Sequence, residues 1–187
     1  MRIIGGNFKG KKILEPKDKE TRPLKDLTKE SIFNIINHSN KFSVNIEGSN
    51  VLDLFSGTGS FGLECLSRKA KHVTFVENYK EILPILKKNL FNLKSLNNFK
   101  IIQKDILNNL EITSLKQKFD IIFLDPPYKK NDLNKLLNSI INFKLVKNGG
   151  IIIIHRHKKQ KDIFPNSFKI IEEKQYGISK IIFGSHS

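Results

Sequence analysis

The residues most able to do chemistry begin with a glycine loop that follows a short apolar run. The segment Gly57-Thr-Gly-Ser-Phe-Gly62 has the spacing G-x-G-x-x-G, and Asp53 lies four positions before its first glycine. Between a strand and a helix, such a loop binds a nucleotide-containing cofactor, because glycines let the backbone approach the ligand closely. Glu77 follows Gly57 by twenty residues, at the end of the next apolar run, where a carboxylate can accept hydrogen bonds from both ribose hydroxyls. The loop therefore predicts a cofactor site, the alternative being a tight turn without a ligand.

Asp53 discriminates between two classes of cofactor. The spacing of the loop alone fits a nicotinamide dinucleotide. A carboxylate at the end of the first strand would repel a pyrophosphate, however, and would favour a ligand with positive charge, such as the sulfonium and ammonium of S-adenosylmethionine. Asp105 follows the third apolar run in the same way and is predicted to accept a hydrogen bond from the adenine amino group. Each acid also has a structural interpretation, as a turn or cap residue or as an acid at a helix N-terminus.

The tetrad Asp125-Pro-Pro-Tyr128 ends the fourth apolar run and forms the second chemical motif. In a doubly wound sheet this position lies across the switch point from the glycine loop. Two prolines stiffen the backbone and remove two N–H donors, so an aspartate and a rigid carbonyl can together accept both hydrogens of an exocyclic NH2 group. These acceptors would stabilise the positive charge that the nitrogen gains as it attacks a methyl group, and Tyr128 offers a ring on which a base can stack. The structural alternative is a proline-rich stop after a strand.

Apolar runs that alternate between strand and helix spacing surround these motifs. Strands are predicted at 51–55, 72–76, 99–102, 119–124 and 151–154. Helices are predicted at 61–68, at 79–96 with a start delayed or kinked by Pro84, and at 131–142. This alternation predicts a doubly wound, mostly parallel α/β sheet of the Rossmann-like type. The last two strands, 168–175 and 178–183, are predicted to be antiparallel, because the Tyr176-Gly177 connection is too short for a parallel crossover.

The N-terminal segment differs from the rest of the chain in charge. Arg2, Lys9, Lys11 and Lys12 fall within the first twelve residues, with no acid among them. We expect a small basic β-hairpin over residues 1–20, followed by a helix whose apolar face includes residues 32–36. The chain is accordingly divided into an N-terminal extension, 1–40, and a catalytic domain, 41–187. The four basic residues of the extension are predicted to bind RNA phosphates.

The composition of the chain limits the classes of partner and site that it can have. The chain has 187 residues, a length typical of one sizeable domain, and 33 Lys+Arg against 18 Asp+Glu give a net charge of +15. This charge favours a polyanionic partner such as nucleic acid, although lysine far outnumbers arginine, a bias also typical of A/T-rich codon usage. Cys65 is the single cysteine, which excludes a disulfide framework and an all-cysteine zinc site. With neither a long apolar run nor a secretory signal, the expected location is the cytoplasm.

Taken together, the motifs resemble a known group of enzymes. Asp53-Leu-Phe-Ser-Gly-Thr-Gly59 and Asp125-Pro-Pro-Tyr128 resemble the two signatures of class I S-adenosylmethionine-dependent amino-methyltransferases. One branch, the RsmD family, is resembled more closely, through Arg2-Ile-Ile-Gly-Gly6, Thr21-Arg-Pro23 with Lys29-Glu-Ser-Ile-Phe-Asn34, and Tyr176-Gly-Ile-Ser-Lys180. That family methylates the N2 amino group of one guanine in bacterial 16S ribosomal RNA.

The resemblance implies a role for each matching residue. It implies that the cofactor is S-adenosylmethionine and that the partner is 16S ribosomal RNA or the assembling 30S subunit. It also implies a monomer that binds neither a metal ion nor a membrane. The segment 21–34 would cover the cofactor. The implied site residues are Asp53, Phe55, Gly57, Gly59, Glu77, Asp105 and Arg22 for the cofactor, and Asp125, Pro126, Pro127 and Tyr128 for catalysis at a flipped guanine.

Three positions depart from the family pattern. Leu24 and Leu27 replace polar residues in the covering segment, which leaves its polar contacts open. His155 stands where relatives often have Glu; we predict no catalytic role for it and place it in a basic patch with residues 156–159 and 161, a solvated face being the alternative. Three other functions stay open: an adenine-N6 methyltransferase on DNA or RNA, a dinucleotide-dependent oxidoreductase, and an RNA-binding protein without catalytic activity.

Overall fold

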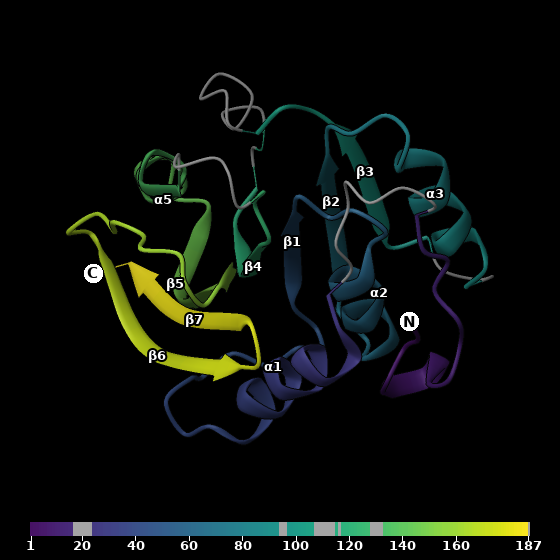
Figure 1. Cartoon of the computed structure of the whole chain (residues 1–187), viewed down its shortest axis with the longest axis horizontal. Coiled ribbons are helices and arrows are strands. Elements are labelled where there is room, and N and C mark those ends of the chain that lie inside the picture. Colours follow the sequence, from purple (N-terminus) through teal and green to yellow (C-terminus); the bar gives the residue numbers. More distant parts are fainter. Residues whose placement is uncertain (17–23, 94–96, 107–114, 116, 128–132, 187) are drawn as a thin grey trace.

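The computed structural model describes residues 1–16, 24–93, 97–106, 115, 117–127 and 133–186 (Figure 1). In this part of the chain a 7-stranded sheet carries helices on both of its faces. The strands are β1 (Asn50–Leu54), β2 (His72–Glu77), β3 (Phe99–Gln103), β4 (Phe119–Leu124), β5 (Val146–His157), β6 (Phe168–Tyr176) and β7 (Ser179–His186). The helices are α1 (Asp26–His38), α2 (Ser60–Ser67), α3 (Leu83–Phe91) and α5 (Leu133–Asn142), with a short 3-10 helix, η1 (Gly6–Phe8).

The strand order, β3-β2-β1-β4-β5-β7-β6, confirms the predicted doubly wound topology. β1 pairs in parallel with β2 on one side and with β4 on the other, and β5 extends the parallel part beyond β4. β7 is antiparallel to both β5 and β6, so the predicted antiparallel C-terminal pair is also confirmed. The winding reverses between β1 and β4, and this switch point is where ligands of such folds bind.

Two apolar clusters fill the space between the sheet and its helices. Alternating residues of each strand belong to opposite clusters, because successive side chains point to opposite faces. One cluster joins the sheet to α1, α2 and α3 and includes three stacked rings, with centroid separations of 5.3 Å for Phe33–Phe61 and 4.1 Å for Phe61–Phe123. The other joins the opposite face to α5 through residues such as Leu137 and Ile140. The strands that end at the switch point are therefore fixed by core contacts on both faces.

Most element boundaries follow the sequence pattern, and β5 is the clearest exception. α3 begins at Leu83 with Pro84 in its first turn, as the delayed start predicts. β5 is longer than the predicted 151–154, because it begins at Val146 and continues to His157. Its first residue, Val146, is buried and pairs with Phe119 of β4, the polar and glycine residues 147–150 span a shift in register, and its last residues pair with β7. Apolar patterning marks only the buried middle of this strand.

The N-terminal arm, residues 1–14, is a reduced version of the predicted hairpin. Arg2 and Lys12 form an isolated antiparallel bridge, and the Ile3 N–H donates to the Lys11 carbonyl (2.9 Å) while the Gly10 N–H donates to the Ile3 carbonyl (2.8 Å). η1 occupies the turn, and the predicted helix that follows is present as α1. With 13 residues α1 is the longest helix of the described chain, and no described helix has the length and hydropathy of a membrane span.

Candidate active site

The loop after β1 is held in a conformation that few residue types adopt readily. Phe55, Gly57 and Gly59 all have positive φ values, of 60°, 53° and 83°. Glycine adopts such values freely because it has no Cβ, and at Gly59 a Cβ would also lie only 2.6 Å from Leu86 Cδ1. Phe55 adopts the same region at an energetic cost, and such strain concentrates at functional sites. A hydrogen bond from the Gly59 N–H to the Ser56 carbonyl (2.7 Å) closes the turn.

The third glycine of the loop brings α2 close to the sheet. A Cβ on Gly62 would lie 2.2 Å from Phe75 Cε1, so a larger residue would force the helix away from β2. The Gly62 N–H donates a hydrogen bond to Asp53 Oδ2 (2.9 Å). Asp53 therefore lies within β1 and beneath the start of α2, which it joins to the strand.

Burial governs the ionisation of Asp53. The residue is 1% exposed, and burial raises the pKa of its carboxyl group to about 8, while repulsion from Asp125 and Glu77 adds to the shift and the Gly62 hydrogen bond opposes it. A ligand with positive charge near these three acids would relieve the repulsion, whereas a pyrophosphate would increase it. The acids of this site fit the sulfonium and ammonium groups of S-adenosylmethionine and disfavour a dinucleotide.

Glu77 fixes the glycine loop to the end of β2. One of its carboxylate oxygens accepts a hydrogen bond from the Gly57 N–H (2.7 Å), and the other accepts bonds from the N–H groups of Asn78 and Tyr79 (2.8 Å each). A carboxylate offers about four acceptor positions, so capacity remains for a ribose hydroxyl. Asp105 is exposed just beyond the end of β3, the strand that pairs with β2. Contact of either acid with the cofactor stays a prediction.

Asp125 follows β4 at the carboxyl edge of the sheet, across the switch point from Asp53. Its Oδ1 lies 2.8 Å from His155 Nδ1, and His155 Nε2 lies 2.9 Å from Ser179 Oγ. The Asp125 side chain is 20% exposed, against 8% for that of His155. The carboxylate is therefore held by the histidine on one side and remains accessible to a ligand.

The predicted basic patch is wrong at its first two residues. His155 is 6% exposed and Arg156 is 0% exposed. Arg156 Nε donates to Asp162 Oδ1 (3.0 Å), and Nη1 donates to the Pro126 carbonyl (3.4 Å). The lysines beyond the strand do remain exposed. The signal that was missed is the unbroken apolar run Ile151–Ile154, which indicates that both faces of the strand are covered where His155 and Arg156 continue it.

Some of the predicted site residues cannot be placed. Arg22 and Tyr128 lie outside the described residues. Within the tetrad, Pro126 is buried and Pro127 is exposed. Among the residues described, no three His, Cys, Asp or Glu side chains are grouped to hold a metal ion. The roles assigned to the tetrad, and the absence of a metal, stay predictions.

The basic arm lies along α2. Near the start of that helix, Lys29 Nζ donates to the Arg2 carbonyl (2.6 Å) and lies 3.3 Å from Ser60 Oγ. Near its end, Ser67 Oγ donates to the Gly5 carbonyl (2.6 Å). All four residues predicted to bind RNA are exposed: Arg2, Lys9, Lys11 and Lys12.

A buried charge cluster, which the sequence pattern does not reveal, fixes the arm to α1 and α2. Glu64 is 0% exposed; it accepts hydrogen bonds from the Ile4 N–H (2.8 Å) and from Arg68 Nε (2.9 Å). Lys29 Nζ lies 3.8 Å from Glu64 Oε2. Burial lowers the pKa of Lys29, while Glu64 and Asp26 oppose that shift.

Asn89 of α3 joins the arm to the glycine loop. Its Oδ1 accepts a hydrogen bond from the Leu14 N–H (2.8 Å), and its Nδ2 donates to the carbonyls of Leu14 (3.1 Å) and Thr58 (3.0 Å). The arm therefore leaves the core beside the glycine loop, shortly before the segment predicted to cover the cofactor.

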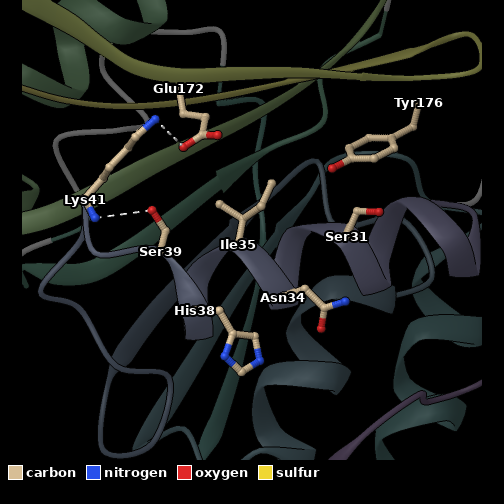
Figure 2. A pocket seen from close by; sticks show the side chains of 8 residues that line it. All are labelled: Ser31, Asn34, Ile35, His38, Ser39, Lys41, Glu172 and Tyr176. Carbon is tan, nitrogen blue, oxygen red and sulfur yellow. Dashed lines mark hydrogen bonds and ion pairs between the residues drawn. The ribbon is translucent and has the colours of Figure 1, made fainter.

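An open groove of about 570 Å³ lies between α1 and β6 (Figure 2). An ion pair between Lys41 and Glu172 (3.0 Å) lies toward one end and Tyr176 toward the other. Tyr176 is paired in register with Ser179, so this end of the groove adjoins the His155–Ser179 contact. The lining residues are Ser31, Asn34, Ile35, His38, Ser39, Lys41, Glu172 and Tyr176.

Known proteins are similar in sequence to this chain over nearly its whole length. A family model described as "Conserved hypothetical protein 95" matches residues 1–185. The ribosomal RNA small subunit methyltransferase D of Haemophilus influenzae is 34% identical over 183 residues, covering 95% of this chain and 90% of that protein. Its counterpart in Buchnera aphidicola subsp. Acyrthosiphon pisum is 36% identical over 172 residues, covering 92% of this chain and 86% of that protein.

A solved structure extends the similarity to the fold. A putative methyltransferase from Escherichia coli superposes with a TM-score of 0.82 at 25% identity, covering 100% of this chain and 97% of that one. The sequence matches confirm the resemblance to the RsmD branch, and the structural match confirms the methyltransferase fold. On this evidence the chain belongs to the RsmD family, that of the ribosomal RNA small subunit methyltransferase D.

Proposed function

We propose that this chain transfers a methyl group to the exocyclic N2 amino group of a guanine in 16S ribosomal RNA during maturation of the small ribosomal subunit. Its relatives are named as methyltransferases of small-subunit ribosomal RNA. The observation that carries the proposal is the position of Asp125, a partly exposed carboxylate across the switch point from the glycine loop. A cofactor on that loop and an amino group at Asp125 would be neighbours at this point of the fold.

The cofactor proposed for the loop is S-adenosylmethionine, which when bound supplies the methyl group from its sulfonium. Gly57 and Gly59 let the backbone approach the ligand, and Glu77 fixes the loop while offering its remaining acceptor positions to the ribose. Asp105 is proposed to accept a hydrogen bond from the adenine amino group. Asp53 favours positive charge above it, because ionisation of this buried acid needs a compensating cation.

Asp125 and the Pro126 carbonyl are proposed as the acceptors for the target amino group. That nitrogen is a poor nucleophile, because its lone pair is delocalised into the guanine ring. Acceptors for both hydrogens favour its pyramidal form and stabilise the positive charge that develops as the nitrogen–carbon bond forms and the carbon–sulfur bond breaks. The electron pair of the broken bond stays on sulfur, and the nitrogen releases one proton to water at the partly exposed site. Tyr128 is proposed to stack on the base.

The proposed substrate is 16S ribosomal RNA, free or within the assembling 30S subunit. A base in a stack cannot reach Asp125, so the target guanine must flip out into the site. The net charge of +15 and the exposed basic residues of the arm support a polyanionic partner. The protein is proposed to act as a monomer in the cytoplasm, without a metal ion.

Substitution of Asp125 tests the assignment of the site. Asp125→Ala should keep its affinity for S-adenosylmethionine and lower turnover on unmodified 16S ribosomal RNA by at least about 100-fold, because it loses an acceptor needed in the transition state. Asp120→Ala is the matched control: Asp120 also belongs to β4, but it pairs with Lys147 (2.8 Å) at the amino end of the strand. Wild-type turnover in Asp125→Ala would contradict the proposal.

A further inference from the structure

We infer that His155, held by Ser179, is a positioning residue that orients the Asp125 carboxylate toward the amino group of the substrate. The inference rests on the proposed function, because it assigns a further residue to the same site. It also replaces the prediction of a surface basic patch, which the burial of His155 contradicts.

The register of the sheet places the three residues in one row. Leu124 of β4 lies opposite Ile154 of β5, so Asp125 and His155 follow side by side at the carboxyl edge. Ser179 begins β7 on the far side of β5. The distances, 2.8 Å from Asp125 Oδ1 to His155 Nδ1 and 2.9 Å from His155 Nε2 to Ser179 Oγ, are those of hydrogen bonds.

The chemistry of the three groups fixes the direction of the first bond. An ionised carboxylate can only accept, so His155 Nδ1–H is the donor to Asp125. The Ser179 hydroxyl can donate to a bare Nε2 or accept from a protonated one, so it holds the ring in either state. The Nδ1–H bond restricts the rotation of the Asp125 carboxylate. The exposed part of Asp125 is then presented to the substrate in one orientation.

The environment of His155 argues against a packing role. The residues before it on β5, Ile151 to Ile154, are all buried isoleucines. An apolar side chain would continue that pattern at lower desolvation cost, yet a histidine stands at the one position that faces both Asp125 and Ser179. The next residue, Arg156, contacts the Pro126 carbonyl (3.4 Å). The end of β5 therefore contacts both of the proposed acceptors.

Kinetics of His155 variants test the inference. His155→Phe keeps a ring in place and removes both nitrogens; we expect kcat on 16S ribosomal RNA to fall by about 10- to 100-fold, with KM and the affinity for S-adenosylmethionine unchanged. His155→Asn should recover most of the loss, because its amide N–H can take the place of Nδ1–H. His72→Phe is the matched control, since His72 begins β2 and so lies at the amino ends of the parallel strands, away from Asp125 at their carboxyl ends. It should leave kcat unchanged.

Two outcomes would overturn the inference: wild-type kcat in His155→Phe, or an equal loss in His155→Phe and His155→Asn. If His155→Phe does not fold, Ser179→Ala replaces it, with kcat expected to fall by about three- to tenfold. Unchanged kcat in Ser179→Ala would then overturn the inference.

Nitrogen-15 NMR of histidine-labelled protein separates this inference from the proposed function. A protonated Nδ1 signal of His155 that shifts in Asp125→Ala supports the hydrogen bond whether or not the wild type methylates RNA. An Nδ1 signal that does not respond to Asp125→Ala overturns it. A wild-type protein that methylates no RNA contradicts the proposed function instead.

Discussion

Among single residues, Asp53 has the environment with the clearest consequence for pH dependence. Its carboxyl group is buried, and burial raises its pKa to about 8. At pH 7 the group is mostly protonated in the free protein, and a cation bound above it favours release of that proton. The stability of the free protein and its affinity for a cationic ligand therefore respond to pH in opposite directions.

Asp53→Asn tests this account of the free protein. The folded pKa of about 8 lies above the unfolded value of about 3.9, so the contribution of Asp53 to stability is complete below about pH 4 and is lost as the pH rises to about 8. The substituted amide does not titrate, so Asp53→Asn should lose less stability than the wild type between pH 5 and pH 8. Urea unfolding at both values measures the difference.

The control for this comparison is Glu30→Gln, which changes an exposed acid of α1. It should leave the pH dependence of unfolding at its wild-type value. Parallel stability curves for Asp53→Asn and the wild type would show that Asp53 titrates as an ordinary carboxyl group.

At the scale of elements, the arm, α1 and α2 depend on the buried pair of Lys29 and Glu64. Lys29→Met removes one of the two cations beside the buried Glu64 and leaves the other, Arg68, with its Nε at 2.9 Å; loss of one partner of a buried ion pair costs about 3 kcal/mol. We expect the free energy of unfolding to fall by about that amount. Lys29→Met combined with Glu64→Gln should recover part of it, because the buried position 64 then carries no charge and Arg68, the cation left behind, is 22% exposed to solvent. Urea denaturation measures both variants.

The exposed ion pair of Lys69 and Glu47 (3.3 Å) is the matched control for that experiment. Lys69→Met should cost less than about 1 kcal/mol, because solvent screens an exposed pair. Equal costs for Lys29→Met and Lys69→Met would mean that the buried cluster does not fix the arm.

The same elements show what sequence predicts and what it does not. The apolar runs and Pro84 predicted the order of strands and helices, because burial of a strand or a helix face leaves a periodic pattern. Helical spacing indicates the pair of Glu64 with Arg68 four residues on, but nothing local indicates that its other partners are Lys29 and the Ile4 N–H. Such partners are separated by tens of positions along the chain, so only the three-dimensional fold brings them together.

The candidate site also has residues whose position the sequence predicts and residues whose position it does not. Asp53, Glu77 and Asp125 were predicted from their places at the ends of apolar runs, because parallel strands bring such ends to one edge. His155 was misinterpreted, because its role depends on the register that sets it beside Asp125 and Ser179. The pairing of β5 with β4 and β7 cannot be inferred from the charged residues near His155 in the sequence.

At the scale of the whole molecule, the arm covers buried α2 and exposes four basic residues to solvent. If Arg2, Lys9, Lys11 and Lys12 contact phosphates, their combined substitution by alanine should weaken RNA binding. The slope of log affinity against log salt should become shallower by about 0.7–0.9 for each phosphate that the variant no longer neutralises. Affinity for S-adenosylmethionine should not change. Filter binding at several salt concentrations measures the slope.

The three exposed lysines beyond β5 provide the comparison: Lys158, Lys159 and Lys161. Their combined substitution by alanine tests whether general loss of charge explains the result. A salt slope that stays at its wild-type value in the arm variant would show that the arm is solvated and does not contact RNA.

The proposed reaction of this protein is methylation of N2 of a guanine in small-subunit ribosomal RNA. The most direct test incubates purified protein with unmodified 16S ribosomal RNA, naked and assembled into 30S subunits, and with S-adenosylmethionine that carries a deuterated methyl group. Digestion to nucleosides and mass spectrometry then identify the labelled base. We expect labelled N2-methylguanosine from the wild type, formed at least about 100-fold more slowly by Asp125→Ala. Label in N6-methyladenosine, or in no nucleoside of either substrate, would contradict it.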